Sequence, residues 1–285
     1  MSRAAAPRLA IVTDSTAHLP QAVLERHGIT SVPLTVVLDG EAVEDGTEDA
    51  ARRLTQALRQ RQAVTTSRPS PAAFAETYRR LAGAGARAIV SVHLSSEISG
   101  THDAALLAAR DAPVPVRVVD SRLIAMGLGF AVLSAAEAAE AGGTADEAAA
   151  AAAKRAEGAA AFFYVDTLEH LRRGGRIGTA RALFGSALAV KPLLEMAEGR
   201  IELREKVRTA GRAIARLEDL AVQHAGSGPV DIAVQHLAAG ERAAELAERL
   251  AARLPGLGEL HVSEVGAVLG AHTGPGLLGA VVAPR

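Results

Sequence analysis

Hydroxyl side chains gather at two places in the first half of the chain. Residues 92–105, VHLSSEISGTHDAA, hold three serines and a threonine between an apolar run and an alanine-rich run, and residues 65–70, TTSRPS, hold four more hydroxyls. Such groups suit a nucleophile, a phosphate-binding loop or a site for another anion. Each segment is expected to form a loop that leads into a predicted helix, where free backbone N–H groups and the helix dipole favour a negative group. The alternative is that the hydroxyls only cap these helices.

The sequence patterns argue against the first two chemistries. A hydrolase nucleophile needs the pattern Gly-x-Ser-x-Gly, and within these two segments a glycine follows only Ser99. The chain has no Gly-x-x-x-x-Gly-Lys-Ser/Thr phosphate-binding sequence. The nearest dinucleotide-binding pattern, GLGFAV at 127–132, lacks its third small residue and lies in a predicted helix. A site for another kind of anion is therefore favoured.

Acidic and imidazole side chains form a second group of candidates. Asp14, Asp120 and Asp166 each close a predicted strand, where carboxylates could hold Mg²⁺ as in a kinase. The simpler interpretation is that they cap helices or anchor loops. His272 stands among glycines and a proline, so we predict that it lies on a glycine-rich loop from which its imidazole reaches a ligand. The nine histidines show no zinc-ligand spacing, and no metal site is expected.

The composition limits the class of protein. With 285 residues, 49% hydrophobic and 22% charged, the chain is long enough for one large or two ordinary globular domains. Its 31 basic and 32 acidic residues show no basic excess of the kind that binds nucleic acid. The absence of cysteine excludes disulfides, thiolate zinc sites and a thiol nucleophile. Neither a signal peptide nor a membrane-spanning segment is predicted, so we expect a cytoplasmic location.

Strands and helices alternate along the first half of the chain. Apolar, β-branched runs predict strands at 8–15, 31–40, 87–94 and 114–121, each followed by a helical pattern. This alternation implies right-handed crossovers and an N-terminal layered α/β domain with a mainly parallel sheet, residues 1–155.

Helix boundaries can also be placed in this half. Thr47 is a predicted N-cap, because acidic residues follow it, and Ser70 is another, because Pro71 follows it. The apolar segment 123–136 is shorter than the roughly 20 residues that span a bilayer. We therefore interpret it as a buried helix.

The pattern changes after about residue 155. A strand is predicted at 160–167, then two short helices around a glycine turn within 168–190, and then a hairpin over 191–207 that turns at Glu198-Gly199. The remaining predicted elements are helices at 210–225 and 240–254 and strands at 230–237, 260–266 and 277–283. We infer a C-terminal α/β domain with a mixed sheet, residues 156–285.

A series of short motifs resembles the DegV family of fatty-acid-binding proteins. The resemblance extends from residue 9 to about residue 282. Each motif alone is weak evidence of a relationship, but the succession of all seven in order makes an accidental match to the family improbable. The motifs are VTDSTAHLP, TTSRPSP, SSEISGTHDAA, VVDSRLIAMGLG, VDTLEHLRRGGRIG, GSALAVKPLLEMAEGRIELREKVRT and GAHTGPGLLG.

The resemblance implies a DegV-like fold of two α/β domains that bury one long-chain fatty acid between them. It also implies a non-catalytic carrier subunit of a bacterial fatty acid kinase, with no cofactor besides the bound acid. The carrier presents the carboxylate to a separate ATP-using, dihydroxyacetone-kinase-like subunit, which makes acyl phosphate for phospholipid synthesis. The implied partners are the acid and the kinase subunit, with no nucleic acid, no integral membrane segment and at most transient membrane contact.

The family's carboxylate ligands fall on Thr66, Ser99 and His272 of this sequence. A buried, unpaired carboxylate costs several kcal/mol, which two hydroxyls and an imidazole can offset. We expect a protonated His272 to supply positive charge as well. Low aromatic content, 2%, suits an aliphatic ligand better than stacked nucleotide rings.

Further residues are expected to support this site. Arg176 matches the arginine of the family's GGRI motif and is placed near the pocket mouth or the kinase-docking surface. Ser95 and Ser96 are expected to shape the loop before Ser99. The possible supporting residues are Ser67, Ser96, Gly100 and Arg176.

Two residues depart from the family pattern. Arg68 stands where glutamine is common, and Glu97 stands where a small residue is frequent. Arg68 either adds positive charge near the headgroup or points to solvent.

Two other functions stay open at this point. One is a small-molecule kinase or transferase of the dihydroxyacetone-kinase type that uses the three strand-end aspartates and Mg²⁺. The other is a serine hydrolase that uses Ser95, Ser96 or Ser99, and it ranks last.

Overall fold

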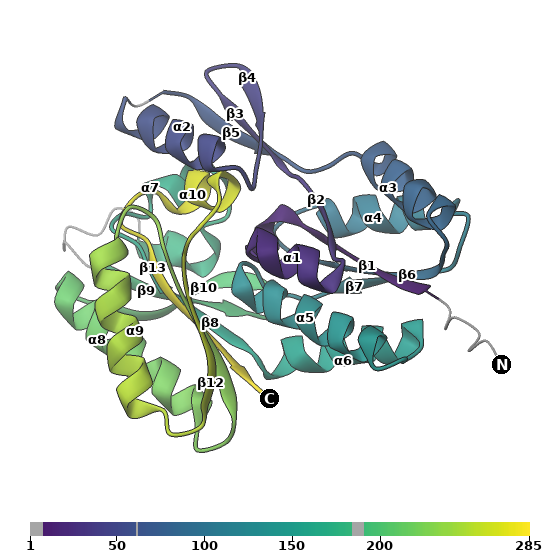
Figure 1. Cartoon of the computed structure of the whole chain (residues 1–285). Coiled ribbons are helices and arrows are strands. Elements are labelled where there is room, and N and C mark those ends of the chain that lie inside the picture. The colour runs from purple at the N-terminus through teal and green to yellow at the C-terminus, as the bar shows by residue number, and fades with distance from the viewer. Residues whose placement is uncertain (1–7, 61, 184–190) are drawn as a thin grey trace. The chain divides into compact units, whose positions relative to one another are not determined.

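The chain divides into two compact units. The computed structural model describes residues 8–60, 62–183 and 191–285 (Figure 1). The first unit contains the chain up to Leu34 together with Arg68–Glu157, and the second contains Thr35–Ser67 together with Gly158–Arg285. One division therefore falls close to residue 155, whereas the segment Thr35–Ser67 groups with the C-terminal half of the chain.

The first unit is built on a parallel sheet with the strand order β2-β1-β6-β7. Its strands are β1 (Arg8–Asp14), β2 (Thr30–Val32), β6 (Ala86–His93) and β7 (Val116–Asp120), and each neighbouring pair is parallel. Its helices are η1 (Ser15–Ala17), α1 (Gln21–His27), α3 (Pro71–Gly83), α4 (Thr101–Ala109), α5 (Met126–Glu140) and α6 (Ala145–Gly158). The predicted parallel α/β arrangement is confirmed.

Helices cover both faces of this parallel sheet. Phe74 and Tyr78 of α3 pack with Ala105 of α4 against Val12 and Ile89 of the sheet in one buried cluster. Figure 1 shows α5 and α6 on the opposite side of the sheet, and α5 contacts β1 and β6. Because parallel strands share one carboxyl edge, the loops after β1, β6 and β7 leave the sheet together.

Two details of the predicted helices are confirmed. Ser70 caps α3, since its Oγ accepts a hydrogen bond from the backbone N–H of Ala73 at 3.2 Å. The segment predicted as a buried helix forms most of α5, whose side chains are largely buried. Within the part of the chain that the structure describes, no helix is long and apolar enough to cross a lipid bilayer.

The single strand predicted over 31–40 is wrong. β2 ends at Val32 in the parallel sheet, and β3 (Thr35–Leu38) belongs to a different sheet in the second unit. Pro33 lies at the break, and proline both fixes φ and lacks the N–H that a sheet ladder needs. The apolar pattern continues on both sides of the break and so hides it in the sequence.

A small antiparallel sheet, in the order β4-β3-β5, opens the second unit and was not predicted. Its other strands are β4 (Glu41–Glu44) and β5 (Val64–Ser67). α2 (Glu48–Arg59) and α10 (Ala267–Thr273) pack against each other and against this sheet. Thr47 caps α2 as predicted, since its Oγ1 accepts from the backbone N–H of Ala50 at 3.1 Å.

The second unit also contains a mixed sheet in the order β10-β9-β8-β13-β11-β12. Only the β11–β12 pair of this sheet is parallel. The strands are β8 (Ala160–Tyr164), β9 (Lys191–Ala197), β10 (Arg200–Val207), β11 (Val230–His236), β12 (Leu257–Glu264) and β13 (Leu278–Pro284). The other helices of this unit are α7 (Glu169–Arg173), η2 (Gly178–Leu183), α8 (Ala210–Ala225) and α9 (Gly240–Arg253). The predicted mixed sheet is confirmed.

One face of the mixed sheet carries the core of the second unit. Leu217 of α8 and Leu246 of α9 belong to the same buried cluster as Tyr164, Ile232 and Val282 of the sheet. The two helices therefore cover the same face (Figure 1).

The hairpin predicted over 191–207 is also confirmed. β9 and β10 join at Glu198-Gly199, and both residues have positive φ, as a two-residue hairpin turn requires. The two short helices predicted before the hairpin correspond to α7 and η2, and residues 184–190 of that prediction lie outside the described residues.

Candidate anion site

The aspartate at the end of β1 is saturated with hydrogen bonds. Asp14 is fully buried, and its carboxylate accepts from the backbone N–H and hydroxyl of Thr16, from the backbone N–H of Leu94 and from Nδ1–H of His93 at 3.0 Å. These bonds tie the loop after β1 to the end of β6. The carboxylate therefore anchors the carboxyl edge of the parallel sheet.

A buried chain of hydrogen bonds continues from His93. Ser91 Oγ lies 2.7 Å from His93 Nε2, and the hydroxyl of Tyr78 donates to Ser91 Oγ at 2.9 Å. A hydrogen bond donated from Nδ1 of His93 and one accepted at its Nε2 would satisfy every bond in the chain. Burial raises the pKa of Tyr78 to about 12. This Ser-His-Asp series has no solvent exposure, so it is placed to hold the core together rather than to meet a substrate.

The other two strand-end aspartates also anchor loops. Asp120 accepts from the backbone N–H of Arg122 at 2.8 Å and from the hydroxyl of Ser96 at 2.6 Å. Asp166 accepts from the hydroxyl of Tyr164, and its side chain lies 3.3 Å from Lys191 Nζ. Among the described residues, no group of three or more histidines and acidic side chains could hold a metal ion. The anchoring interpretation therefore fits the three aspartates better than a shared Mg²⁺ site.

The serine-rich loop after β6 has a firmly held beginning. Ser95 is fully buried, and its carbonyl accepts from the backbone N–H groups of Ile98 and Ser99. Ser96 is held by Asp120. Both serines thus shape the loop, which leaves Ser99 as the hydroxyl at its far end.

Ser99 and Gly100 form the junction between this loop and α4. Ser99 is half-buried, its Oγ lies 2.9 Å from Thr101 Oγ1, and it accepts from the backbone N–H of Thr101 at 3.3 Å. Arg68, from the same unit, lies over Gly100: its Nη1 is 1.7 Å from the place where a Cβ on that glycine would be. The guanidinium therefore lies over Gly100, the residue that follows Ser99.

Thr66 and His272 meet in the second unit. Thr66 Oγ1 lies 2.9 Å from His272 Nε2, although 206 residues separate the two along the chain. Both expectations about their local structure are wrong, because Thr66 lies in strand β5 rather than in a loop, and His272 lies in helix α10 rather than on a glycine-rich loop. The glycines around His272 serve close packing, as the surroundings of α10 show.

Three contacts fix the position of α10. Gly270 faces Leu54 of α2 and Leu237, and a Cβ there would lie 2.6 Å from Leu54 Cδ2. The carboxylate of Asp45, which is buried, accepts from the backbone N–H of Val268 in the first turn at 3.1 Å. Gly274 ends the helix at a φ of +73° and donates its N–H to the carbonyl of Gly270 at 2.8 Å. The glycines of this motif thus permit a closely packed helix.

The glycines of two distant motifs make room for histidines. A Cβ on Gly174 would lie 2.0 Å from His272 Nδ1, and a Cβ on Gly274 would lie 2.2 Å from Cδ2 of His170. Each histidine therefore packs on a glycine of the other motif, which joins the α7 region to α10. Gly174 and His170 were not predicted as positioning residues, and the adjacent glycines before Arg176 are the signal that could have indicated them.

His272 is neutral at neutral pH, contrary to the expectation that it supplies positive charge. Burial, aided by the positive charge of Arg176, lowers the pKa of His272 to about 4. Its Nδ1 is buried and has no hydrogen-bond partner among the described residues. The full positive charge near this imidazole is therefore that of Arg176, which is exposed.

The predicted site residues are divided between the two units. Thr66, Ser67, Arg176 and His272 belong to the second unit, while Ser96, Ser99 and Gly100 belong to the first. Within the second unit Thr66 and His272 are brought together. Ser67, at the end of β5, pairs with Thr35 of β3.

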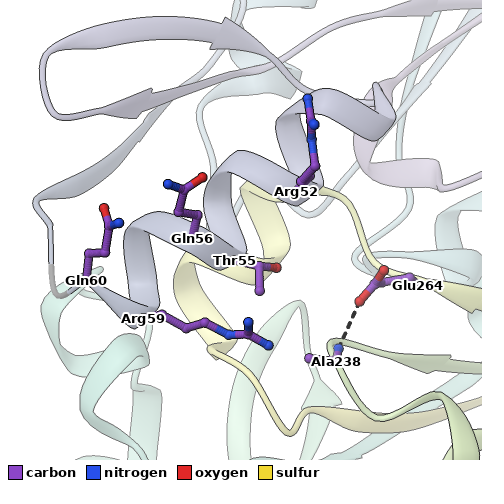
Figure 2. A pocket seen from close by; sticks show the side chains of 7 residues that line it. All are labelled: Arg52, Thr55, Gln56, Arg59, Gln60, Ala238 and Glu264. Carbon is purple, nitrogen blue, oxygen red and sulfur yellow. Dashed lines mark hydrogen bonds between the residues drawn. The ribbon is translucent and has the colours of Figure 1, made fainter.

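A separate hollow of about 520 Å³ lies beside α2 (Figure 2). Figure 2 shows Arg59 reaching from α2 towards Ala238, whose backbone N–H donates to the Glu264 carboxylate at 2.9 Å. The charged and amide side chains here do not suit an aliphatic ligand. The lining residues are Arg52, Thr55, Gln56, Arg59, Gln60, Ala238 and Glu264, none of which is a predicted carboxylate ligand.

Sequence comparison places the chain among known relatives. Residues 8–285 match a family model described as an uncharacterised protein, DegV family. A DegV domain-containing protein of Streptomyces coelicolor is 69% identical over 277 residues, which cover 97% of this chain and 99% of the relative. Protein DegV of Bacillus subtilis is 38% identical over 277 residues, which cover 95% and 97% respectively.

Solved structures of DegV family proteins have the same fold as this chain. A DegV family protein from Thermus thermophilus, described by its fatty acid binding, superposes with a TM-score of 0.92 at 36% identity over 98% of this chain and all of the other. DegV of Bacillus subtilis, described as a fatty acid binding protein, superposes with a TM-score of 0.89 at 35% identity over 98% of this chain and 99% of the other.

Proposed function

Because this chain belongs to the DegV family, we propose that it binds a long-chain fatty acid, whose carboxylate is held by Thr66, Ser99 and His272. The observation that carries the proposal is the hydrogen-bonded pair of Thr66 and His272, formed by residues from two distant motifs. The fatty acid binding described for the structures from Thermus thermophilus and Bacillus subtilis supports it.

The chemistry of the pair suits a carboxylate. Thr66 Oγ1 and His272 Nε2 lie 2.9 Å apart, within hydrogen-bond distance. A neutral imidazole with its proton on Nε2 and a threonine hydroxyl are both donors, so a carboxylate accepting from both would replace their mutual bond. The hydroxyl of Ser99 adds a third donor. Three donors offset the cost of removing a carboxylate from water.

The acyl chain would contribute most of the affinity. A chain of about 16 carbons gains about 10 kcal/mol on burial, at about 0.8 kcal/mol for each methylene and before the costs of association. In the mixed sheet, the side chains of Phe163, Leu194 and Val281 alternate with those that face α8 and α9, and all three are buried and apolar. That face of the sheet has the apolar character which such a chain requires.

The proposal includes a role as carrier. The bound acid would be presented in the cytoplasm to a separate, ATP-using kinase subunit that forms acyl phosphate, and this chain would itself have no catalytic role. The local hydrogen bonds of Asp14, Asp120 and Asp166 support the carrier over the alternative of a kinase with its own Mg²⁺ site. ATP turnover by the purified chain alone would favour that alternative.

Lipid extraction tests the binding proposal. Protein purified without added lipid is denatured and its extract is examined by mass spectrometry, and the delipidated protein is then titrated with palmitate by calorimetry. We expect a long-chain acid in the extract and saturable binding of palmitate. A delipidated, folded protein that takes up no fatty acid would overturn the proposal.

A serine variant tests the assigned headgroup ligand in the first unit. Ser99→Ala should weaken palmitate binding about ten-fold, because it removes one donor to a charged group. The matched control is Ser227→Ala, at an exposed serine that belongs to no predicted site. Equal affinity of the two variants would remove Ser99 from the site while leaving fatty acid binding itself in place.

A further inference from the structure

We propose that Arg68 is an additional headgroup ligand, which makes the site selective for ionised lipids over neutral ones. This inference rests on the proposed function, because it places the carboxylate of the bound acid next to Ser99. It resolves the two interpretations that the sequence left open for Arg68 in favour of the headgroup. Arg68 and Ser99 belong to the same unit.

The position of the guanidinium carries the argument. Nη1 and Cζ of Arg68 lie 1.7 Å and 2.8 Å from the place of a Cβ on Gly100, and its Cδ lies 3.1 Å from the same place. The end of the side chain is therefore in contact with the backbone of Gly100, the residue after Ser99. The side chain is exposed, and its guanidinium end lies against the serine loop.

The backbone of Gly100 gives a second reason. Its φ is −80° and its ψ is 15°, a conformation that residues with a side chain also adopt. The conformation alone thus does not require glycine at this position. The guanidinium occupies the space that a Cβ would fill, so a side chain here would displace the flexible end of Arg68. Gly100 and Arg68 therefore form a matched pair.

The chemistry of the pair complements Ser99. A serine hydroxyl donates one hydrogen bond and carries no charge, whereas a guanidinium presents several donors in one plane and stays ionised at any physiological pH. His272 is neutral at neutral pH, since its pKa is lowered to about 4. A cation beside Ser99 would therefore add charge recognition to a set of three neutral donors.

The role of Arg68 can be tested by changing the charge of the ligand and the charge of residue 68 in the same set of titrations. Palmitic acid and the matching primary alcohol are titrated into the delipidated full chain and into Arg68→Gln. We expect the variant to bind the acid about ten-fold more weakly and the alcohol unchanged, since only the acid forms a charged pair. Arg110→Gln, an exposed arginine in the same unit, is the control for net charge and should match the wild type with both ligands.

Gly100→Ala is a second, independent test of whether Arg68 contacts the headgroup. Its Cβ would displace the flexible end of Arg68 without removing the charge, so acid binding should again fall about ten-fold. In the Arg68→Gln background the same change should have no further effect, because the two single changes act on one contact.

Three other results are possible, and each would contradict the role of Arg68, the proposed function or both. Equal losses for acid and alcohol in Arg68→Gln would show a structural role and overturn the inference. Unchanged acid binding in Arg68→Gln, with weakened binding in Ser99→Ala, would overturn the role of Arg68 and leave the proposed function standing. A wild-type protein that binds no acid would overturn both.

Discussion

Thr66 and His272 show how two ordinary residues become a candidate site. Neither is charged at neutral pH, yet their 2.9 Å contact places two donors side by side. Thr66→Val keeps the shape of the side chain and removes its hydroxyl, so we expect palmitate affinity to fall about ten-fold. Calorimetric titration of the delipidated protein measures the change.

The neighbouring threonine supplies the control for that prediction. Thr65 is exposed and its side chain points to the other face of β5, because successive side chains of a strand alternate. Thr65→Val should therefore bind palmitate like the wild type. A similar loss of affinity in both variants would trace the effect to the strand rather than to the hydroxyl of Thr66.

The lowered pKa of His272 predicts a specific dependence of stability on pH. The value of about 4 in the folded protein lies below the value of about 6.5 in an unfolded chain. Between these values the unfolded chain binds more protons, so acid favours unfolding. We expect His272 to account for about 2 kcal/mol of the stability lost between about pH 7.5 and pH 5.

Urea unfolding of the ligand-free wild type and of His272→Gln at the two pH values tests this. The variant should lose about 2 kcal/mol less than the wild type over the same interval. Burial also lowers the pKa values of His170 and His236, but both are present in both proteins and cancel in the comparison. Equal losses would mean that His272 is not held neutral by its surroundings.

The sequence indicated the site residues only in part. Thr66, Ser99 and His272 could be named because short motifs around them resemble a known family, since their own spacing singles out no chemistry. The contact between Thr66 and His272 could not be predicted, because nothing local links residues 206 positions apart. The neutral state of His272 follows from burial, which also becomes known only from the folded structure.

At the scale of elements, α10 is the part that positions the imidazole. Asp45 holds its first turn by accepting from the backbone N–H of Val268. Asp45→Ala leaves that donor without this acceptor, so we expect a loss of about 1–3 kcal/mol in the free energy of unfolding together with weaker palmitate binding. Urea titration and calorimetry measure the two effects.

Asp49 offers a matched aspartate for this comparison. It is exposed and pairs with arginines on the surface of α2, and such pairs contribute little to stability. Asp49→Ala should therefore change the free energy of unfolding by less than about 0.5 kcal/mol. If both variants behaved alike, the bond from Asp45 would not be what fixes the helix.

Elements with strong local signals were predicted well, and elements set by packing were not. The parallel strands β1 and β6 and the hairpin of β9 and β10 follow from apolar patterning and turn residues. The helical state of α10 was missed because Gly270 in its interior disfavours a helix, and because the glycines at its two ends suggested a loop. Close packing against Leu54 overrides that preference, and a single sequence does not reveal it.

At the scale of the molecule, a ligand that binds only the folded chain must stabilise it. Palmitate present at about 100 times its dissociation constant should raise the free energy of unfolding by about 2.7 kcal/mol. The rise in melting temperature of the delipidated protein, followed by circular dichroism, measures this. Acetate has the same headgroup without the chain and should give no rise at the same concentration. A melting temperature unaffected by palmitate would contradict saturable binding to the native state.

The composition and the alternation of elements predicted two contiguous α/β parts divided near residue 155, whereas the chain passes between the two compact units after Leu34, Ser67 and Glu157. They did not indicate that Thr35–Ser67 groups with the C-terminal half. The reason is physical: β3, β4, β5 and α2 resemble a continuation of the first unit in pattern, and only their packing with α10 assigns them to the second.

This discontinuous arrangement has a consequence for biosynthesis. A ribosome adds about 5–20 residues per second, so roughly 10–40 s pass between the emergence of Thr66 and that of His272, 206 positions later. During this interval α2 and β5 lack the helix that covers Leu54 in the finished molecule. The contact between Thr66 and His272 is therefore among the last features to form on a nascent chain, and a truncated product that stops before α10 carries an exposed apolar surface for chaperones to recognise.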